Sequence, residues 1–204
     1  MGKQVWKPGT MVSPVPPVMV SCGSLEKPNI LTIAWTGIVN TIPAMTYISV
    51  RPERHSYPII KERGEFVINL TTRRLTRAAD YCGVKSGANI DKFAACKLTA
   101  EPASQVSAPL IKESPVNIEC RVKQVIPLGS HEMFLAQIIA VNVDEELVDQ
   151  NGKLHLDRSG LVAYSHGEYF ALGEKLGSFG FSVRKKPKAS AHPPSSKKRS
   201  RKKK

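Results

Sequence analysis

Six short apolar runs, separated by proline and glycine, constrain the fold of this chain more than any other feature of its sequence. They are PVMVSCG (17–23), NILTIAWTGIVN (29–40), MTYISVRP (45–52), EFVINLT (65–71), NIECRVKQVIPLG (117–129) and MFLAQIIAVNVDEEL (133–147). Runs of this length, rich in β-branched residues and bounded by turn residues, are typical of β-strands. Helical patterns do not alternate with them, which argues against a doubly wound α/β sheet. The sequence therefore predicts a mainly β protein folded as a closed or nearly closed antiparallel barrel.

The second run has an unusual composition on one face. Alternation along a strand places these side chains together: Thr32, Ala34, Thr36, Ile38 and Asn40. A solvated strand face usually carries Lys, Glu or Arg, and a buried face is apolar. Short hydroxyls and an amide instead let a heterocycle approach closely and form hydrogen bonds. This face therefore predicts a flat, polar ligand lying against the strand.

A predicted helix begins directly after the third run, beside two arginines. HSYPIIKERG offers His55 or Ser56 as the N-cap, and Arg51 and Arg54 precede it. The unpaired N–H groups of a helix N-terminus favour a phosphate or carboxylate, and arginine adds bidentate, charge-assisted hydrogen bonds. The alternative is that Ser56 only caps the helix and that both arginines are solvated.

The polar strand face and the predicted anion site could bind two parts of one ligand. A phosphate held at Ser56 and the two arginines would let a polyol and a flat ring extend along the polar strand face as far as Thr41. Flavin mononucleotide (FMN) has this shape, because it carries one phosphate, a ribityl chain and a tricyclic ring edged with nitrogen and oxygen. The residues therefore predict FMN as the cofactor.

The order of several motifs resembles the flavin reductase-like family of FMN-binding split barrels, and most of all its flavoredoxin branch. The motifs are NILTIAWTGIVNTIPAMTYISVRPERHSYPIIKERGEFVINL, then YCGVKSGANIDKF, APLIKESPVNIEC and GSHEMFLAQI, and the resemblance covers roughly residues 12–183. It implies a six-stranded antiparallel Greek-key split barrel with a few short helices. It also implies a homodimer that holds FMN near the subunit interface.

Site residues follow from the resemblance, position by position. The segment similar to the family's flavin-ring and ribityl stretch contains Thr32, Ala34, Trp35, Thr36, Asn40 and Thr41, and the segment similar to its phosphate-binding turn contains Arg51, Arg54, His55, Ser56 and Tyr57. Many flavin reductases have hydroxyl residues throughout that turn, so this chain has fewer hydroxyls there. The two arginines are expected to compensate electrostatically.

GSHEMF resembles the family's glycine-aspartate-histidine stretch, with Ser130 in place of the acid. His131 then has two interpretations: a residue on the side of the flavin that receives the reductant, or a polar residue at a strand end. No residue is assigned as catalytic, because hydride transfer needs positioning rather than a general base. The segment YSHGEYFALGEKLGSFGFS resembles the family's C-terminal stretch that covers the pocket or reaches the partner subunit, and Lys92 in IDKF has no assigned role.

The resemblance implies an oxidoreductase that passes reducing equivalents through FMN, with NADH or NADPH as the donor of a hydride to flavin N5. The reduced flavin would serve a monooxygenase or another redox protein. The alternative is a flavoredoxin-like electron carrier that does not use NAD(P)H directly. The chain contains no GxGxxG fingerprint, so a separate dinucleotide-binding domain is not expected.

Charge divides the chain into two parts. The formal charge is +13, and eleven of the basic residues lie in residues 184–204, so the remainder is close to neutral. We expect an N-terminal arm (1–11), a barrel domain (12–183) and a disordered basic tail (184–204). The tail offers another alternative function, which is weak and salt-dependent binding to nucleic acid without sequence preference.

Four cysteines show no CxxC pair and no histidine at metal-ligand spacing: Cys22, Cys82, Cys96 and Cys120. They are expected to be buried small hydrophobes in a reducing compartment, with no metal site. No segment approaches the roughly 20 apolar residues of a membrane span. The sequence therefore predicts a cytoplasmic protein.

Overall fold

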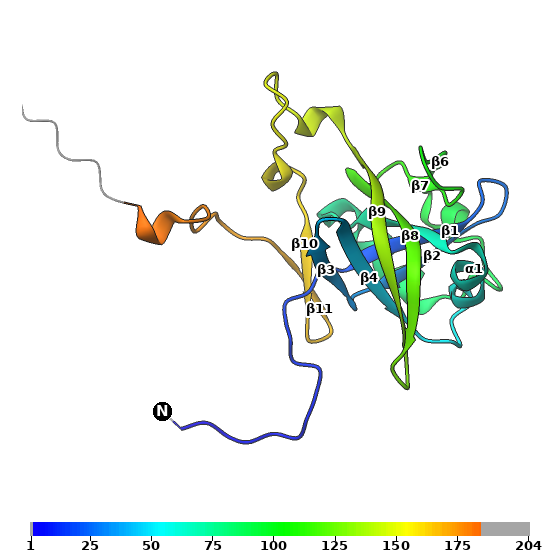
Figure 1. Ribbon diagram of the computed structural model, residues 1–204, viewed down its shortest axis with the longest axis horizontal. Helices are drawn as coiled ribbons and strands as arrows, with labels where there is room; N and C mark the ends of the chain where they lie inside the picture. Colours follow the sequence, from blue (N-terminus) through cyan, green and yellow to red (C-terminus); the bar gives the residue numbers. More distant parts are fainter. Residues whose placement is uncertain (1, 185–204) are drawn as a thin grey trace, which may run out of the picture. The chain divides into compact units, whose positions relative to one another are not determined.

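The computed structural model describes residues 2–184 (Figure 1). The basic tail predicted from residue 184 onward lies outside the described residues, apart from Arg184. The chain divides into a compact unit of residues 1–172 and a second unit that begins at Gly173, in which the short 3₁₀ turn η4 (Phe181–Val183) is the described element. All strands of the described residues belong to the first unit. No helix in the described part of the chain is long and apolar enough to span a membrane.

Seven strands form one antiparallel sheet: β1 (Val18–Gly23), β2 (Pro28–Ile33), β3 (Thr36–Thr41), β4 (Ala44–Val50), β5 (Glu65–Leu70), β8 (Val116–Pro127) and β9 (Glu132–Val143). Their order in the sheet is β2-β1-β5-β8-β9-β4-β3. Two small hairpins pair β6 (Ala100–Glu101) with β7 (Leu110–Ile111), and β10 (Val162–Ser165) with β11 (Glu168–Ala171). The helices are α1 (Ser56–Arg63), α2 (Thr76–Val84) and α3 (Lys92–Cys96), with 3₁₀ turns η1 (Arg73–Leu75), η2 (Glu145–Leu147) and η3 (Leu156–Arg158).

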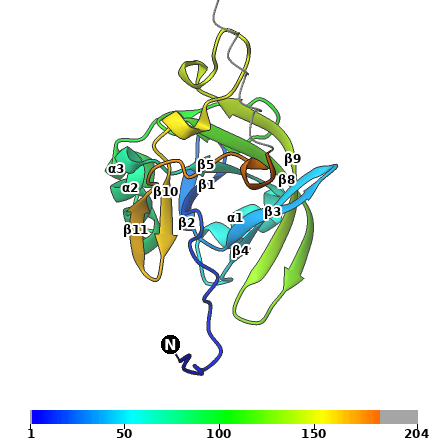
Figure 2. The same cartoon turned by 90° about the vertical axis from the view of Figure 1, so that its left-hand side faces the viewer.

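The barrel closes at the link between β2 and β3, which follow one another in the sequence but do not pair. β2 and β3 stand at opposite ends of the strand order, yet only Ala34 and Trp35 connect them. The run NILTIAWTGIVN is therefore two strands, and the six predicted runs supply seven strands. At this link the chain leaves its pairing with β1 and joins β4, and the Trp35 carbonyl accepts a hydrogen bond from the Ser49 N–H at 2.9 Å. Figure 2 shows the strands curving around an interior, in the predicted mainly β split-barrel fold.

Two apolar cores lie on the two faces of β1, which is buried along its whole length. The barrel core contains Val18, Val20, Cys22, Leu31, Ile33, Ile48, Val50, Ile60, Phe66, Ile68, Cys120, Phe134 and Ala136. The outer core packs α2 and α3 against the sheet and contains Met19, Ile30, Leu75, Ala79, Cys82, Phe93 and Ile111. The two short helices are thereby fixed against the outer face of β1 and β2.

Candidate functional site

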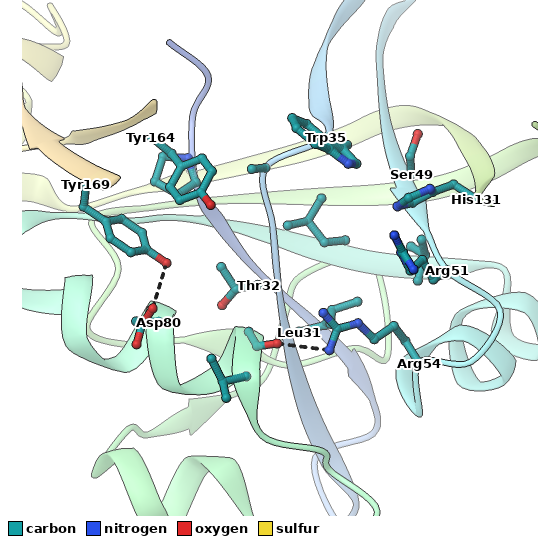
Figure 3. A pocket seen from close by; sticks show the side chains of 16 residues that line it. Leu31, Thr32, Trp35, Ser49, Arg51, Arg54, Asp80, His131, Tyr164 and Tyr169 are labelled. Carbon is teal, nitrogen blue, oxygen red and sulfur yellow. Dashed lines mark hydrogen bonds between the residues drawn. The ribbon is translucent and has the colours of Figure 1, made fainter. Parts of the chain in front are cut away.

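A cavity of about 370 Å³, the larger of two adjoining cavities, lies where the barrel closes (Figure 3). Its wall combines β2, the Ala34–Trp35 link, the end of β4, the last turn of α2 and the β10–β11 hairpin. The lining residues are Pro17, Leu31, Thr32, Ile33, Ala34, Trp35, Ser49, Val50, Arg51, Arg54, Asp80, Gly83, Val84, His131, Tyr164 and Tyr169. This volume is within the range of small-molecule sites.

Charge is distributed unevenly around this cavity. Arg51, Arg54 and His131 line one side, and Asp80 with Tyr169 lines the other (Figure 3). The Arg54 guanidinium is held in place because its Nη1 donates to the Gly83 carbonyl at 3.0 Å. The cavity therefore presents a cationic side to a ligand, opposite an acidic and phenolic side.

His131 stands beside Arg51 on the cationic side. Burial lowers the pKa of its imidazole, and the positive charge of Arg51 lowers it further, so the ring is mostly neutral near pH 7. Ser130 Oγ lies 3.0 Å from His131 Nδ1. Ser130 therefore orients the ring without supplying a negative charge.

Two tyrosines of the β10–β11 hairpin form the opposite wall. The rings of Tyr164 and Tyr169 meet edge to face, with centroids 5.2 Å apart. Burial raises the pKa of Tyr169 to about 12, and the charge of Asp80 adds to this effect. Tyr169 is therefore a neutral phenol at physiological pH, and its hydroxyl lies 3.5 Å from Asp80 Oδ1.

A smaller cavity, about 100 Å³, adjoins the start of α1. Its lining residues are Leu31, Glu53, Arg54, His55, Ser56, Lys85, Ser86, Gly87 and Lys92. Leu31 and Arg54 also line the larger cavity, so the two cavities share a border. Three of the lining side chains carry a positive charge and one carries a negative charge, so the smaller cavity favours an anion.

Lys92 is the most deeply buried of these cations. Its side chain is on α3 and the residue is only 3% exposed. Nζ donates to the carbonyls of Ile30 at 2.7 Å and Cys82 at 2.8 Å, which leaves the third N–H of the ammonium for another acceptor. Burial lowers the pKa of Lys92. Sequence reasoning gave this residue no role, because the spacing of IDKF does not reveal that the amine turns inward.

Ser56 and Gly87 narrow the smaller cavity. Ser56 is the first residue of α1 rather than its N-cap, and its Oγ accepts a hydrogen bond from Asn29 Nδ2 at 2.7 Å. The Ser56 hydroxyl also lies within hydrogen-bonding reach of the Cys22 sulfur, and its proton can turn instead to an anion in the cavity. A Cβ at Gly87 would lie only 2.0 Å from Asn29 Oδ1, so the backbone approaches here as closely as glycine permits.

The eleven predicted cofactor residues occupy different places. Those lining the larger cavity are Thr32, Ala34, Trp35, Arg51 and Arg54, and those lining the smaller cavity are Arg54, His55 and Ser56. Thr36 lines a third cavity of about 440 Å³, which has more volume than either of these two, and it donates to the Tyr47 carbonyl. Tyr57 packs edge to face against Phe134, with centroids 5.7 Å apart. Neither cavity includes Asn40 or Thr41, which lie at the exposed end of β3, where the strand has diverged from β2.

Sequence reasoning also missed residues that come from distant segments. Asp80 and Gly83 reach the larger cavity from α2, and Lys85 and Ser86 reach the smaller one from the turn that follows. None carries a local pattern that marks a site, because their position depends on how α2 packs on β2. Thr32 illustrates this packing, since its hydroxyl donates to the Ala79 carbonyl of α2.

Comparison with known proteins identifies the family. Residues 11–173 match the model of the flavin reductase like domain. This chain belongs to the flavin reductase-like family. Within the family it is similar to the flavoredoxin of Desulfovibrio vulgaris (Miyazaki F), with 33% identity and a TM-score of 0.83 over 90% of this chain and 100% of that one. The family match and the similarity to a flavoredoxin confirm the resemblance that motif order indicated.

Two curated relatives of this flavin reductase-like protein are also informative. An uncharacterized protein of Archaeoglobus fulgidus is 31% identical over 146 residues, which is 72% of this chain and 81% of that protein. The NADPH-flavin oxidoreductase of Streptomyces viridifaciens is 23% identical over 142 residues, covering 67% of this chain and 72% of that protein.

Proposed function

We propose that this protein binds FMN, with the flavin ring in the larger cavity and the phosphate in the smaller one, and acts as a flavin-dependent oxidoreductase. The observation that carries this proposal is the shared border of the two cavities at Leu31 and Arg54. A ligand with a flat polar ring at one end and a phosphate at the other can occupy both at once.

The residues of the smaller cavity fit a monophosphate. Arg54 and Lys92 supply charge-assisted donors, and Ser56 supplies a hydroxyl donor. A buried ammonium without a carboxylate partner is costly, and a bound anion offsets that cost. Gly87 keeps the backbone clear of a side chain where the wall is tightest. The donor set therefore suits FMN, whose phosphate is terminal and doubly charged.

The chain's own residues position the reactants. When bound, FMN supplies a ring that accepts two electrons as a hydride at N5. Arg54 is oriented by the Gly83 carbonyl, and Trp35 and the two tyrosines supply flat apolar surface on the cavity wall. The neutral His131 imidazole offers a hydrogen bond without adding a positive charge, which suits a site that also receives a cationic nicotinamide after hydride transfer.

The reductant divides this proposal into two versions. In the first, NADH or NADPH reduces the bound flavin, as the name of the Streptomyces relative suggests for that protein. In the second, the protein is an electron carrier that receives electrons from another redox protein, as its similarity to a flavoredoxin suggests. We favour direct reduction by NAD(P)H, because the wall of the larger cavity carries Trp35 and two tyrosines, on which a second flat ring can stack.

An anaerobic absorption spectrum tests the proposal. Purified protein is mixed with equimolar FMN, and the visible bands are recorded before and after adding NADH or NADPH. Rapid bleaching of bound flavin supports the reductase, and the faster donor is the physiological class of reductant. Bleaching by dithionite alone supports the electron carrier, and failure to bind FMN contradicts both versions.

We also propose that a second copy of the chain covers the β3–β4 hairpin. Ile38 and Ile42 are 86% and 90% exposed, and Val39 lies between them. A contiguous exposed apolar patch of this kind usually marks an interface. Ile38→Asp is expected to convert a dimer into a monomer in sedimentation velocity. Leu25→Asp, on the exposed β1–β2 turn, is the matched control and should remain dimeric; a wild-type monomer would contradict the proposal.

A further inference from the structure

Two cysteines meet in the outer core, away from the cavity walls. Cys82 belongs to α2 and Cys96 is the last residue of α3, and their Sγ atoms are 3.9 Å apart. This is van der Waals contact, compared with about 2.05 Å in a disulfide. Both cysteines are free thiols.

The two thiols differ in their access to solvent. Cys82 is fully buried, and burial raises the pKa of its thiol to about 12. Cys96 is only half-buried at the edge of the outer core. A small oxidant would therefore reach Cys96 first, with Cys82 already in place behind it. Cys22 and Cys120 are fully buried in the barrel core and serve as internal controls.

The same two helices carry or contact two of the cations of the smaller cavity, Lys92 and Arg54. α3 has only five residues, so Lys92 at its start and Cys96 at its end move together. The Cys82 carbonyl accepts the hydrogen bond from Lys92 Nζ, and the carbonyl of the next residue, Gly83, accepts the one from Arg54. Lys92 and Arg54, two of the three cations of the smaller cavity, are thus anchored on or beside one member of the cysteine pair.

We propose that Cys82 and Cys96 form a reversible disulfide whose formation weakens anion binding in the smaller cavity. The effect on FMN rests on the proposed function, whereas the disulfide itself does not. Bond formation requires the sulfurs to approach by almost 2 Å, given the bond length of about 2.05 Å. Because α3 is short, this displacement reaches Lys92 and disturbs the carbonyls that orient Lys92 and Arg54.

Hydrogen peroxide is the oxidant in this scheme. The Cys96 sulfur attacks one peroxide oxygen, the O–O bond breaks, and Cys96 sulfenic acid and water are formed. The Cys82 sulfur then attacks the sulfenic sulfur, the S–O bond breaks, and a second water leaves with the Cys82 proton. Two thiols thereby lose two electrons and two protons, and one peroxide becomes two waters. A dithiol such as dithiothreitol reverses the oxidation by exchange.

Peptide mapping tests the disulfide without any flavin. Full-length protein is treated with hydrogen peroxide, alkylated and digested with trypsin under non-reducing conditions. We expect AADYCGVK (78–85) linked to FAACK (93–97). Before alkylation, the intact oxidised protein should have a mass lower than the reduced protein by two hydrogens. Cys22→Ala with Cys120→Ala should retain the link, and Cys96→Ser should abolish it. Absence of the linked peptides from wild-type protein, which needs no variant, overturns the proposal.

FMN titration tests the consequence for the site. Quenching of FMN fluorescence is measured for reduced, oxidised and re-reduced wild-type protein. We expect oxidation to raise the Kd at least tenfold, dithiothreitol to restore it, and peroxide to have no effect on Cys96→Ser. A linked protein with a Kd within twofold of the reduced form would overturn the regulatory part. If the reduced protein binds no FMN, the proposed function fails and regulation fails with it, while the peptide map still decides whether the disulfide exists.

Discussion

Two buried polar clusters, one around Glu119 and one around Lys92, differ in where their hydrogen bonds go. Glu119 is fully buried on β8, and its carboxylate accepts four hydrogen bonds from Ser104, Gln105 and Asn142. Beside it, Asn69 and Asn117 bond to each other and to neighbouring backbone groups. The polar groups of this cluster are satisfied by the protein itself.

Lys92 and Ser56 are also buried, but their cluster, which includes the exposed Arg54, remains open. The ammonium has two carbonyl partners for three donors, Ser56 retains a hydroxyl proton, and Arg54 uses one nitrogen on the Gly83 carbonyl. Its cations are not paired with a carboxylate in the described salt bridges. A closed cluster stabilises the fold, whereas an open cationic cluster is stabilised by a ligand. The two should therefore respond oppositely to mutation.

Glu119→Ala should produce the largest change, and it should affect stability alone. Removing the carboxylate leaves the four donors of Ser104, Gln105 and Asn142 without their acceptor, which costs on the order of 3 kcal/mol of unfolding free energy. Urea denaturation measures the loss, and the Kd for FMN should stay within twofold of wild type. Glu62→Ala, an exposed acid on α1, is the control. Equal stability of both variants would remove the distinction between the clusters.

Arg54→Ala should produce the second-largest change, and this change should be in the affinity for FMN. Loss of a charge-assisted pair to phosphate costs about 2 kcal/mol, or roughly a thirtyfold higher Kd for FMN. The unfolding free energy should change by less than about 0.5 kcal/mol, because the side chain is exposed to the cavities. Arg74→Ala, an exposed arginine outside both cavities, should bind FMN normally. A stability loss without a change in Kd would make Arg54 a structural residue.

Lys92→Met should weaken FMN binding about tenfold and remove a pH dependence. The folded pKa of Lys92 is lowered by burial, so a bound phosphate raises it and binding takes up a proton. In wild type, the Kd should rise as the pH increases through the lowered folded pKa of Lys92. The titration is made above pH 7.5, where the phosphate is already a dianion. The unfolding free energy of the protein without ligand should instead increase with pH up to about 10.5. The reason is that the unfolded state, with the higher Lys92 pKa, binds more protons than the folded state in this range.

Ser56→Ala should have the smallest effect, about 1 kcal/mol or a fivefold higher Kd. The hydroxyl is neutral, and Asn29 Nδ2 also loses its acceptor in the variant. Asn29→Ala in the same titration separates the two contributions. If Asn29→Ala raises the Kd as much as Ser56→Ala, the serine acts by positioning the asparagine rather than by contacting the phosphate.

Sequence reasoning found the parts of this molecule that depend on neighbours along the chain. Strand runs and turn residues are local, and so is the placement of Arg51 and Arg54 before a helix; motif order then identified the family. The break at Trp35 was not predictable, because the run 29–40 contains no proline or turn motif at this position that would separate its two halves. Lys92 was missed for a similar reason, since its inward position depends on the carbonyls of Ile30 and Cys82.

The Ala34–Trp35 link also determines when the larger cavity can form during folding. β2 pairs with β1 and β3 with β4, while β5, β8 and β9 lie between these pairs in the sheet. The cavity wall is therefore complete only after the long-range pairings of the whole barrel, which are slow to form. A ligand that binds a late-forming cavity stabilises the native state but not the transition state. Flavin should accordingly slow unfolding and leave the folding rate unchanged. Its protective effect would therefore be a longer lifetime of the folded protein.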